Sequence, residues 1–279
     1  MRTLHVDKVT AAVAEMCVSA NRFLPEDIRK SLEAGEREET SVSGREILRQ
    51  LNVNCALAAE TGLPLCQDTG YAVFFVELGQ DLRLEGGLLR EAIDAGVRKG
   101  YKEGKLRASV CDPFTRKNTG DNTPAVVHFD LVPGDGLKIT FLAKGGGSEN
   151  MSRATMLSPA QGKAGIREFV LRRVAEAGPN PCPPIIVGVG IGGTFDYAPI
   201  LAKRALLRSL DDLNPDPELA VFEADLLTDI NKLGVGPMGM GGRITALGVK
   251  IAKAPCHIAS LPLAVNIQCH SARHAEVTL

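Results

Sequence analysis

Residues 63–79 read LPLCQDTGYAVFFVELG. Three apolar residues, Leu-Pro-Leu at 63–65, are followed by Cys66 and by a short polar loop, Gln67–Gly70. After this loop comes a run rich in aromatic and β-branched residues. Such a run predicts a strand over residues 71–79. A thiol, an amide and a carboxylate placed directly before a strand are an unusual way to build a core. This junction is therefore where we first look for chemistry.

Outward from this strand, helical and strand patterns alternate. Residues 124–147, PAVVHFDLVPGDGLKITFLAKGGG, combine apolar–polar alternation with a Pro-Gly-Asp-Gly turn and predict a hairpin. Apolar spacings of three and four predict helices, whereas short apolar runs predict further strands. The predicted helices cover 6–20, a segment beginning at Leu24, 44–60, 84–104, 158–178, 198–210 and 217–234, and the further strands cover 183–193 and 256–269.

This pattern predicts an α+β fold, with a helical N-terminal region of about residues 1–62 packed on a mixed, partly antiparallel sheet flanked by helices. We expect residues 1–279 to form a single domain.

The composition excludes several classes of partner. The 279 residues are 44% hydrophobic and 23% charged, and 32 Lys and Arg nearly balance 33 Asp and Glu, which leaves a net charge of −1. This balance gives no electrostatic reason to bind nucleic acid or an anionic membrane. The sequence starts with no secretory signal and has no apolar run of about 20 residues. We therefore predict a cytoplasmic location.

Cysteine usage argues against a disulfide framework. The seven cysteines are odd in number and form no CxxC pair, so zinc ribbons and ferredoxin-type motifs are excluded. Most of these thiols are expected to be reduced and inert. The histidines and cysteines of residues 256–274 fit the spacing of no standard zinc finger.

Four loops gather glycine and polar residues: 66–70, 106–125, 144–152 and 234–243. Consecutive glycines allow backbone N–H groups to approach an anion. Any one of these loops is best explained as a turn, but together with Arg107, Arg153 and Arg243 they indicate a small anionic ligand. No nucleotide-binding fingerprint is present.

Five stretches together closely resemble the class I fumarate hydratase and L-tartrate dehydratase family of oxygen-sensitive iron–sulfur hydro-lyases. The stretches occur in the same order as in the family and together cover nearly the whole chain. The chain resembles the alpha subunit of those family members that are divided into separate subunits. The stretches are 63–79, 106–125, KGGGSENMSRATMLSPAQG at 144–162, VGVGIGGTFDYAPILAKRALLR at 187–208, and residues 233–274, which include APCHIAS and NIQCHSARH.

The resemblance implies a 4Fe–4S cluster held by Cys66, Cys182 and Cys269. Three thiolates leave one iron open, and an open iron can act as a Lewis acid on a hydroxyl and a carboxylate. The other four cysteines match no ligand position of the family.

The resemblance also implies a substrate site. Gln67, Asp68 and Arg107 would contact a four-carbon dicarboxylate, and Gly145 and Gly146 would offer backbone N–H groups to it. His257 matches an active-site histidine of the family. With Asp68 it would form a proton relay, so these two residues are the expected catalytic pair.

Several functional expectations follow from the same resemblance. The main one is an alpha subunit that hydrates fumarate to (S)-malate in central metabolism, and the alternative is an L-tartrate dehydratase alpha subunit that forms oxaloacetate and water. An inactive iron–sulfur sensor is an alternative of another class. The residue that removes the carbon-bound proton belongs to the family's beta part. We therefore expect a beta subunit as partner, an α2β2 assembly, and no activity from this chain alone.

Overall fold

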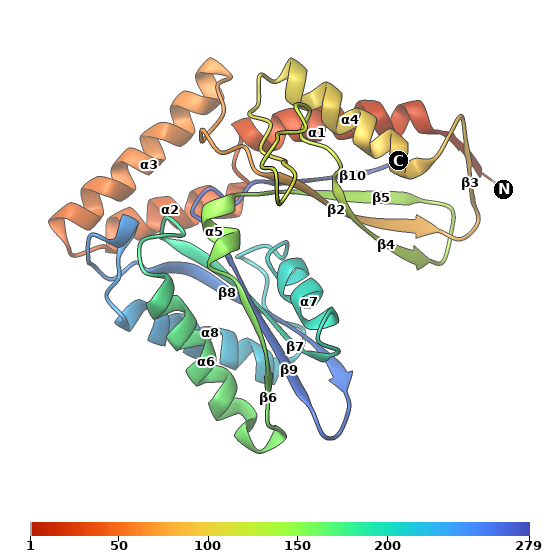
Figure 1. Ribbon diagram of the computed structural model, residues 1–279. Coiled ribbons are helices and arrows are strands. Elements are labelled where there is room, and N and C mark those ends of the chain that lie inside the picture. The colour runs from red at the N-terminus through yellow and green to blue at the C-terminus, as the bar shows by residue number, and fades with distance from the viewer. Residues whose placement is uncertain (1) are drawn as a thin grey trace. The chain divides into compact units, whose positions relative to one another are not determined.

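The computed structural model describes residues 2–279 and divides into two compact units (Figure 1). Unit 1 comprises residues up to Pro25, Cys55–Gly146 and Arg273–Leu279. Unit 2 comprises Glu26–Asn54 and Gly147–Ala272. Each unit has its own sheet and its own apolar core.

Unit 1 is a four-stranded mixed sheet with two helices on one face (Figure 1). The strand order is β10-β5-β2-β4, and a small parallel pair joins β1 to β3. The elements are β1 (Arg2–His5), α1 (Val6–Arg22), β2 (Tyr71–Gly79), β3 (Leu82–Glu85), α4 (Leu89–Glu103), β4 (Val126–Val132), β5 (Leu137–Lys144) and β10 (His274–Thr278).

The two helices of unit 1 approach each other closely because α4 carries glycines where it meets α1. A Cβ on Gly96 would lie 2.6 Å from Val13, and one on Gly100 would lie 2.7 Å from the Ala14 carbonyl oxygen. The apolar side chains of α1 and α4 then share one core with those of β2 and β5. This core lies under the end of the sheet at which β2 begins and β5 ends.

The predicted hairpin at 124–147 is wrong in its pairing. Both strands exist, but β2 lies between them, parallel to β4 and antiparallel to β5. The turn between β4 and β5 passes around the end of β2, where the Gly79 N–H donates to the Gly136 carbonyl oxygen over 2.9 Å. A Cβ on Gly79 would overlap the Gly134 carbonyl oxygen, so this crossing needs glycine.

Unit 2 is a second mixed sheet, of order β6-β9-β7-β8, between helices (Figure 1). Side chains of α6 and α8 fill the core on one face, and α7 packs on the other through Ala198 and Ala202. The elements are α2 (Glu26–Glu38), α3 (Val42–Thr61, which continues into unit 1), α5 (Gly146–Asn150), β6 (Arg153–Leu157), α6 (Gly162–Ala177), β7 (Ile185–Gly193), α7 (Tyr197–Ala205), α8 (Pro217–Lys232), β8 (Ala246–Cys256) and β9 (Leu261–Gln268), with short 3-10 turns at Pro159–Gln161 and Pro237–Gly239.

The α+β prediction is confirmed, although the sheet is divided between two units. The predicted helices correspond to α1, α2, α3, α4, α6, α7 and α8, whereas α5 and the strands β1, β3, β6, β8 and β10 were not predicted. A single catalytic domain over 1–279 stays a prediction. Across residues 2–279, no helix combines the length and apolar character that crossing a bilayer requires.

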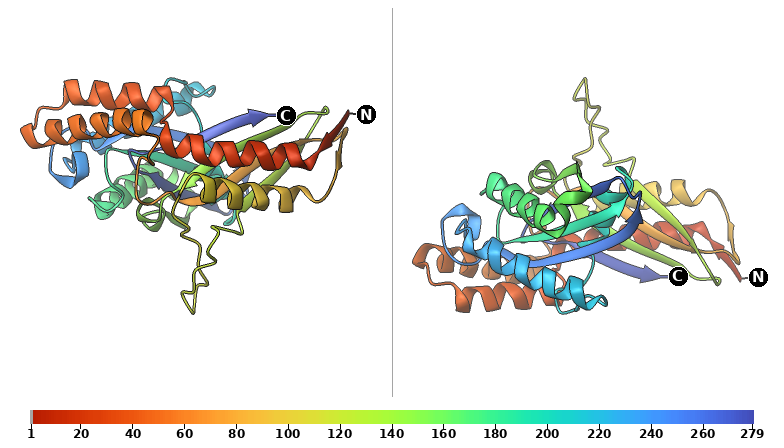
Figure 2. Two further views of the ribbon diagram at one scale, coloured as in Figure 1. Left: turned by 90° about the horizontal axis from the view of Figure 1, so that it is seen from above. Right: turned by 90° about the horizontal axis from the view of Figure 1, so that it is seen from below.

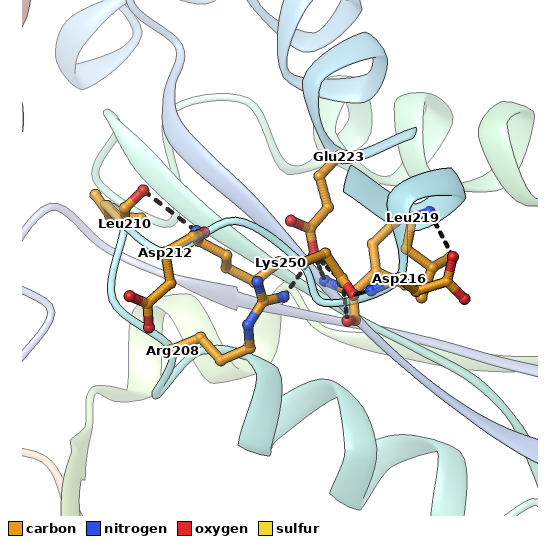
Figure 3. Close-up of polar contacts among 9 residues, drawn as sticks. Arg208, Leu210, Asp212, Asp216, Leu219, Glu223 and Lys250 are labelled. Carbon is orange, nitrogen blue, oxygen red and sulfur yellow. Dashed lines mark hydrogen bonds and ion pairs between the residues drawn. The ribbon is translucent and has the colours of Figure 1, made fainter. Parts of the chain in front are cut away.

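A buried polar network fastens the connection between α7 and α8 to β8 (Figure 3). One carboxylate oxygen of Glu223 accepts hydrogen bonds from Arg208, Asn214 and the Ile251 N–H, each within 2.7 Å. Lys250 on β8 donates to the carbonyl oxygens of Leu210 and Asp212, at 3.2 and 2.6 Å. Because a buried charge without partners is costly, these residues act as a unit.

We expect Glu223→Gln to lower the free energy of unfolding by about 1–3 kcal/mol, since the amide leaves the network's donors incompletely satisfied. Urea denaturation followed by circular dichroism measures this loss. Asp225→Asn, on the exposed face of the same helix, is the matched control. Equal midpoints for the two variants would contradict the assignment.

Burial, aided by nearby Arg208, lowers the pKa of Lys250 below 10.5. As the pH rises from the folded-state pKa towards 10.5, the folded chain loses this proton before the unfolded chain does, so the burial penalty disappears and stability rises. We therefore expect the stability of the wild type relative to Lys250→Met to increase between neutral pH and about pH 10. Denaturant titrations of both proteins across this range test the sign, and a constant difference would refute it.

Candidate active site

The loop Cys66–Gly70 is held against the end of β5. Ahead of it, the buried Leu65 donates its N–H to the Asn21 carbonyl oxygen over 2.8 Å. Gly70 has a φ of +80°, and a Cβ there would lie 2.8 Å from the Lys144 backbone nitrogen. Only glycine fits this position, so the sequence CQDTG fixes where β2 begins relative to β5.

Asp68 joins this loop to the glycines that follow β5. Its Oδ1 accepts from the Gly70 N–H at 3.0 Å, and its Oδ2 accepts from the Gly146 N–H at 2.8 Å. A Cβ on Gly145 would approach Oδ2 to 3.3 Å, which is tight. Asp68, Gly145 and Gly146, which the sequence predicted as site residues, are thus brought together, and the Gly146 N–H binds a carboxylate of the protein itself.

Arg273, which was not predicted as a site residue, holds the backbone of the same loop. It is only 1% exposed, and its Nη1 donates to the Asp68 carbonyl oxygen at 2.6 Å and to Asn21 Oδ1 at 2.9 Å. Arg273 stands four residues after Cys269, but nothing in the sequence distinguishes it from an exposed arginine, since its burial beside Ala272 appears only in the fold. Arg273 is a positioning residue for the Asp68 backbone.

Two further buried side chains hold the loop. The Tyr101 hydroxyl lies 2.9 Å from the carbonyl oxygens of both Thr69 and Gly70, and burial raises the pKa of Tyr101, so its hydroxyl remains a donor. The Asn122 amide donates to the Gly70 carbonyl oxygen at 3.2 Å. These contacts leave the loop little freedom.

Arg107 lies beside this loop through its backbone. Its carbonyl oxygen accepts from the Thr69 hydroxyl at 3.0 Å. The side chain is exposed, and its guanidinium forms no hydrogen bond or ion pair with any residue from 2 to 279. An arginine left without a carboxylate is suited to receive one from a ligand. Gln67 is also exposed, and its Oε1 lies 3.3 Å from the half-buried Cys66 Sγ.

Unit 2 brings the other two predicted cluster cysteines together. The Cys182 carbonyl oxygen accepts from the His270 ring Nδ1 at 2.9 Å and from its backbone N–H at 3.4 Å, so Cys182 adjoins the residue after Cys269. Both thiols are half-buried. Gln268 Nε2 and Ser271 Oγ, on either side of Cys269, are buried polar atoms that find no hydrogen-bond partner among residues 2–279.

His257 occupies the turn between β8 and β9. Its Nδ1 accepts from the Ala259 N–H at 3.1 Å, so a neutral ring carries its proton on Nε2. The residue is exposed and lines a hollow of about 430 Å³ together with Phe222, Ile258 and Leu261. The turn thus presents an Nε2 donor at the edge of an apolar hollow.

The match to known proteins extends over nearly the whole chain. The family model described as "Fumarate hydratase (Fumerase)" matches residues 10–278. The chain belongs to the fumarate hydratase family. The hydro-lyase prediction is thereby confirmed, as is the family resemblance.

Relatives of this fumarate hydratase family chain carry a more specific name. A Methanocaldococcus jannaschii chain with the provisional name L(+)-tartrate dehydratase subunit alpha is 43% identical over 274 residues, covering 96% of each chain. The L(+)-tartrate dehydratase subunit alpha proteins of Escherichia coli O157:H7 and K12 are 33% and 32% identical, covering 98% of this chain and 93% of theirs.

Of the four cysteines outside the predicted cluster set, Cys17 fits the prediction of a buried, inert thiol, whereas Cys55 and Cys111 are half-buried and Cys256 is exposed. Cys17 is fully buried, and burial raises the pKa of its thiol, which makes it unreactive. Within residues 2–279 none of the seven cysteines forms a disulfide. In the same range, no three His, Cys, Asp or Glu side chains are grouped to hold a metal ion. Cys66 belongs to unit 1, whereas Cys182 and Cys269 belong to unit 2, and their convergence stays a prediction.

The glycine-rich loop 234–243 has a structural role. It folds around Glu39, which is fully buried and accepts hydrogen bonds from the N–H groups of Thr40, Ser41, Arg243 and Ile244. Burial alone would raise the pKa of Glu39, but these amide donors outweigh it and hold the pKa below its usual value. The anion that this loop holds is therefore an internal carboxylate.

The position of Arg273 gives a testable expectation. We expect Arg273→Met to increase alkylation of Cys66 about tenfold, because losing a charged hydrogen bond of roughly 1.5–3 kcal/mol lets the loop open. Iodoacetamide labelling of the cluster-free chain, read by peptide mass spectrometry, measures this rate. Arg98→Met, at an exposed arginine of α4, is the control. Unchanged Cys66 labelling in Arg273→Met would overturn the positioning role.

Proposed function

We propose that this chain is the alpha-type subunit of an iron–sulfur hydro-lyase that dehydrates L-tartrate. In this reaction the substrate loses a hydroxyl group from one carbon and a proton from its neighbour, and the resulting enol becomes oxaloacetate. Relatives named L(+)-tartrate dehydratase subunit alpha, aligned over at least 93% of their own length, support this choice. L-tartrate thus takes the place of fumarate, the substrate expected from the sequence.

The observation that carries the proposal is the pairing of a fixed carboxylate with an available guanidinium. Two backbone N–H groups orient Asp68, and the neighbouring segment carries Arg107 with its side chain unpaired among residues 2–279. Arg107 would bind one substrate carboxylate in a bidentate manner. Asp68, with His257 as its proposed relay partner, would accept or return a proton at its carboxylate.

The surroundings of the predicted cluster cysteines support an iron–sulfur cluster. Cys66, Cys182 and Cys269 are half-buried, as are Cys55 and Cys111, so the thiols are not sealed in the core as Cys17 is. The donors Gln268 Nε2 and Ser271 Oγ, which have no partner in the described range 2–279, flank Cys269 and would hydrogen-bond to thiolate or sulfide sulfur. We propose that these three thiols hold a 4Fe–4S cluster, which when bound supplies a Lewis acid for the departing hydroxyl.

We further propose that the site is completed by a beta subunit, which would supply the base that removes the carbon-bound proton. The names of the relatives as alpha subunits support a partner subunit. An α2β2 assembly is the arrangement that we expect. On this proposal the isolated chain is inactive even when its cysteines carry iron.

Hydration of fumarate to (S)-malate is the second candidate, and the family description supports it. Both substrates are four-carbon dicarboxylates, so Arg107 and Asp68 would serve either. Reconstituting the chain anaerobically with its beta-type subunit and comparing kcat/KM for L-tartrate and fumarate separates the two. A preference for fumarate would select the second candidate. Iron incorporation with no turnover of either would support the inactive sensor instead.

In the reconstituted pair we expect Asp68→Asn to lower kcat by about 10²-fold or more, the usual loss when a positioned proton-transfer group is removed. Asp135→Asn, an exposed acid in the β4–β5 turn, should retain full activity. Equal iron content in both variants shows that the loss is catalytic. Wild-type turnover by Asp68→Asn would remove Asp68 from the mechanism.

A further inference from the structure

An ordered loop in unit 1 is exposed along its whole length. Residues 112–120 are all exposed, and Figure 2 shows this segment as the thin yellow-green loop that projects away from the helices and strands of its own unit. Phe114, at its tip, is 93% exposed. We call residues 111–120 the arm. An aromatic side chain at the tip of a projecting loop suits an interface, where aromatic anchors are enriched.

The arm holds its shape through its own hydrogen bonds. Cys111 and Asn118 form an antiparallel bridge, and the Asp112 N–H donates to the Lys117 carbonyl oxygen over 2.9 Å. Asp112 Oδ1 accepts from the N–H groups of Phe114 and Thr115, at 3.0 and 2.7 Å. The tip is therefore pre-organised, which reduces the entropy that binding must overcome.

The charges of the arm define the partner's chemistry. The Asp112 carboxylate faces into the turn, where the Thr115 and Phe114 donors lower its pKa. Beside Phe114, the side chains of Arg116 and Lys117 form no ion pair with any part of the chain from 2 to 279. The arm thus presents one aromatic ring and two unpaired cations. An apolar pocket rimmed by carboxylates complements that surface.

The base of the arm is bonded to the candidate active site. Asn122 accepts from the Ser109 N–H at 2.8 Å through Oδ1 and donates to the Gly70 carbonyl oxygen through Nδ2. Arg107, at the start of the same segment, bonds to Thr69. A subunit bound to the arm therefore acts on the segment that carries the substrate arginine.

We propose that the arm is the docking element for the beta-type subunit, with Phe114 inserted into an apolar, acid-rimmed pocket of that subunit. The inference rests on the proposed function only for the identity of the partner. A second copy of this chain is a poor occupant, because the apolar hollow of unit 2 offers no excess of carboxylates: Lys163 and Lys253 stand against Glu218, and Lys253 is also ion-paired with Asp216.

The experiment measures binding without activity. The full chain and the beta-type subunit from the same genome are purified, and their Kd is determined by titration calorimetry. We expect Phe114→Ala to raise Kd about tenfold or more, the loss typical of a central aromatic anchor. Phe195→Ala, at a phenylalanine 63% exposed in unit 2, is the matched control and should leave Kd unchanged. Thermal unfolding of each variant alone confirms that it is folded.

A second variant tests the charges. We expect Arg116→Glu with Lys117→Glu to weaken binding, and the difference from wild type to shrink between about 50 and about 500 mM NaCl as salt screens the charges. The proposal is overturned if Phe114→Ala binds the beta-type subunit with the wild-type Kd, or if the chain does not bind that subunit at all. It is also overturned if Phe114→Ala abolishes self-association of this chain and leaves binding to the beta-type subunit unchanged. A complex that depends on Phe114 but has no hydro-lyase activity would refute the proposed function and leave the docking role standing.

Discussion

The Asp68 carboxylate is the constraint on which the candidate site depends. It accepts from Gly70 at the start of β2 and from Gly146 after β5, and so fastens two chain segments that are far apart in sequence. Arg273 repeats the connection from the other side, because it binds the Asp68 carbonyl oxygen and begins the segment that leads into β10. Asp68, which is proposed to transfer substrate protons, thus also stabilises the backbone around it.

The strand order explains why these segments meet. β2 and β10 both run antiparallel to β5, with Tyr71 opposite Lys144 and His274 opposite Leu142, so the starts of β2 and β10 lie at the end of β5. β4 runs parallel to β2, which brings the chain that follows Arg107 back to the same end of the sheet. Had β4 and β5 formed the predicted hairpin, β2 would not separate them and this grouping would not arise.

Glycine-rich loops in this chain bind carboxylates that belong to the chain. The loop 234–243 surrounds Glu39, and Gly146 donates to Asp68. The expectation of an anion at these loops was chemically sound, since backbone N–H groups do converge there. A sequence does not say whether the anion comes from a ligand or from a residue distant along the chain. Arg107 differs because its guanidinium has no partner among residues 2–279.

Local patterns predicted the elements better than their pairing. The helices α1, α6 and α8 and the strands β2 and β7 were recognisable because their apolar spacing is set by the core that they face. β8 was missed because Lys250 interrupts its apolar run, and only the carbonyl oxygens of Leu210 and Asp212 make that lysine tolerable inside. β6 and β10 have five residues each, too few for a period to show.

The candidate site shows the same limit. Composition and spacing indicated only a small anionic ligand and a candidate thiolate metal site, because ligands that converge through folding obey no spacing rule. The resemblance to a family supplied Cys66, Asp68 and Arg107 by their neighbours in sequence. It did not supply Arg273 or Tyr101, since their roles come from the buried carbonyl oxygens that they reach, and a carbonyl oxygen leaves no mark in the sequence. Residues that act on a ligand can thus be recognised by type, whereas residues that hold the backbone beneath them emerge only from the fold.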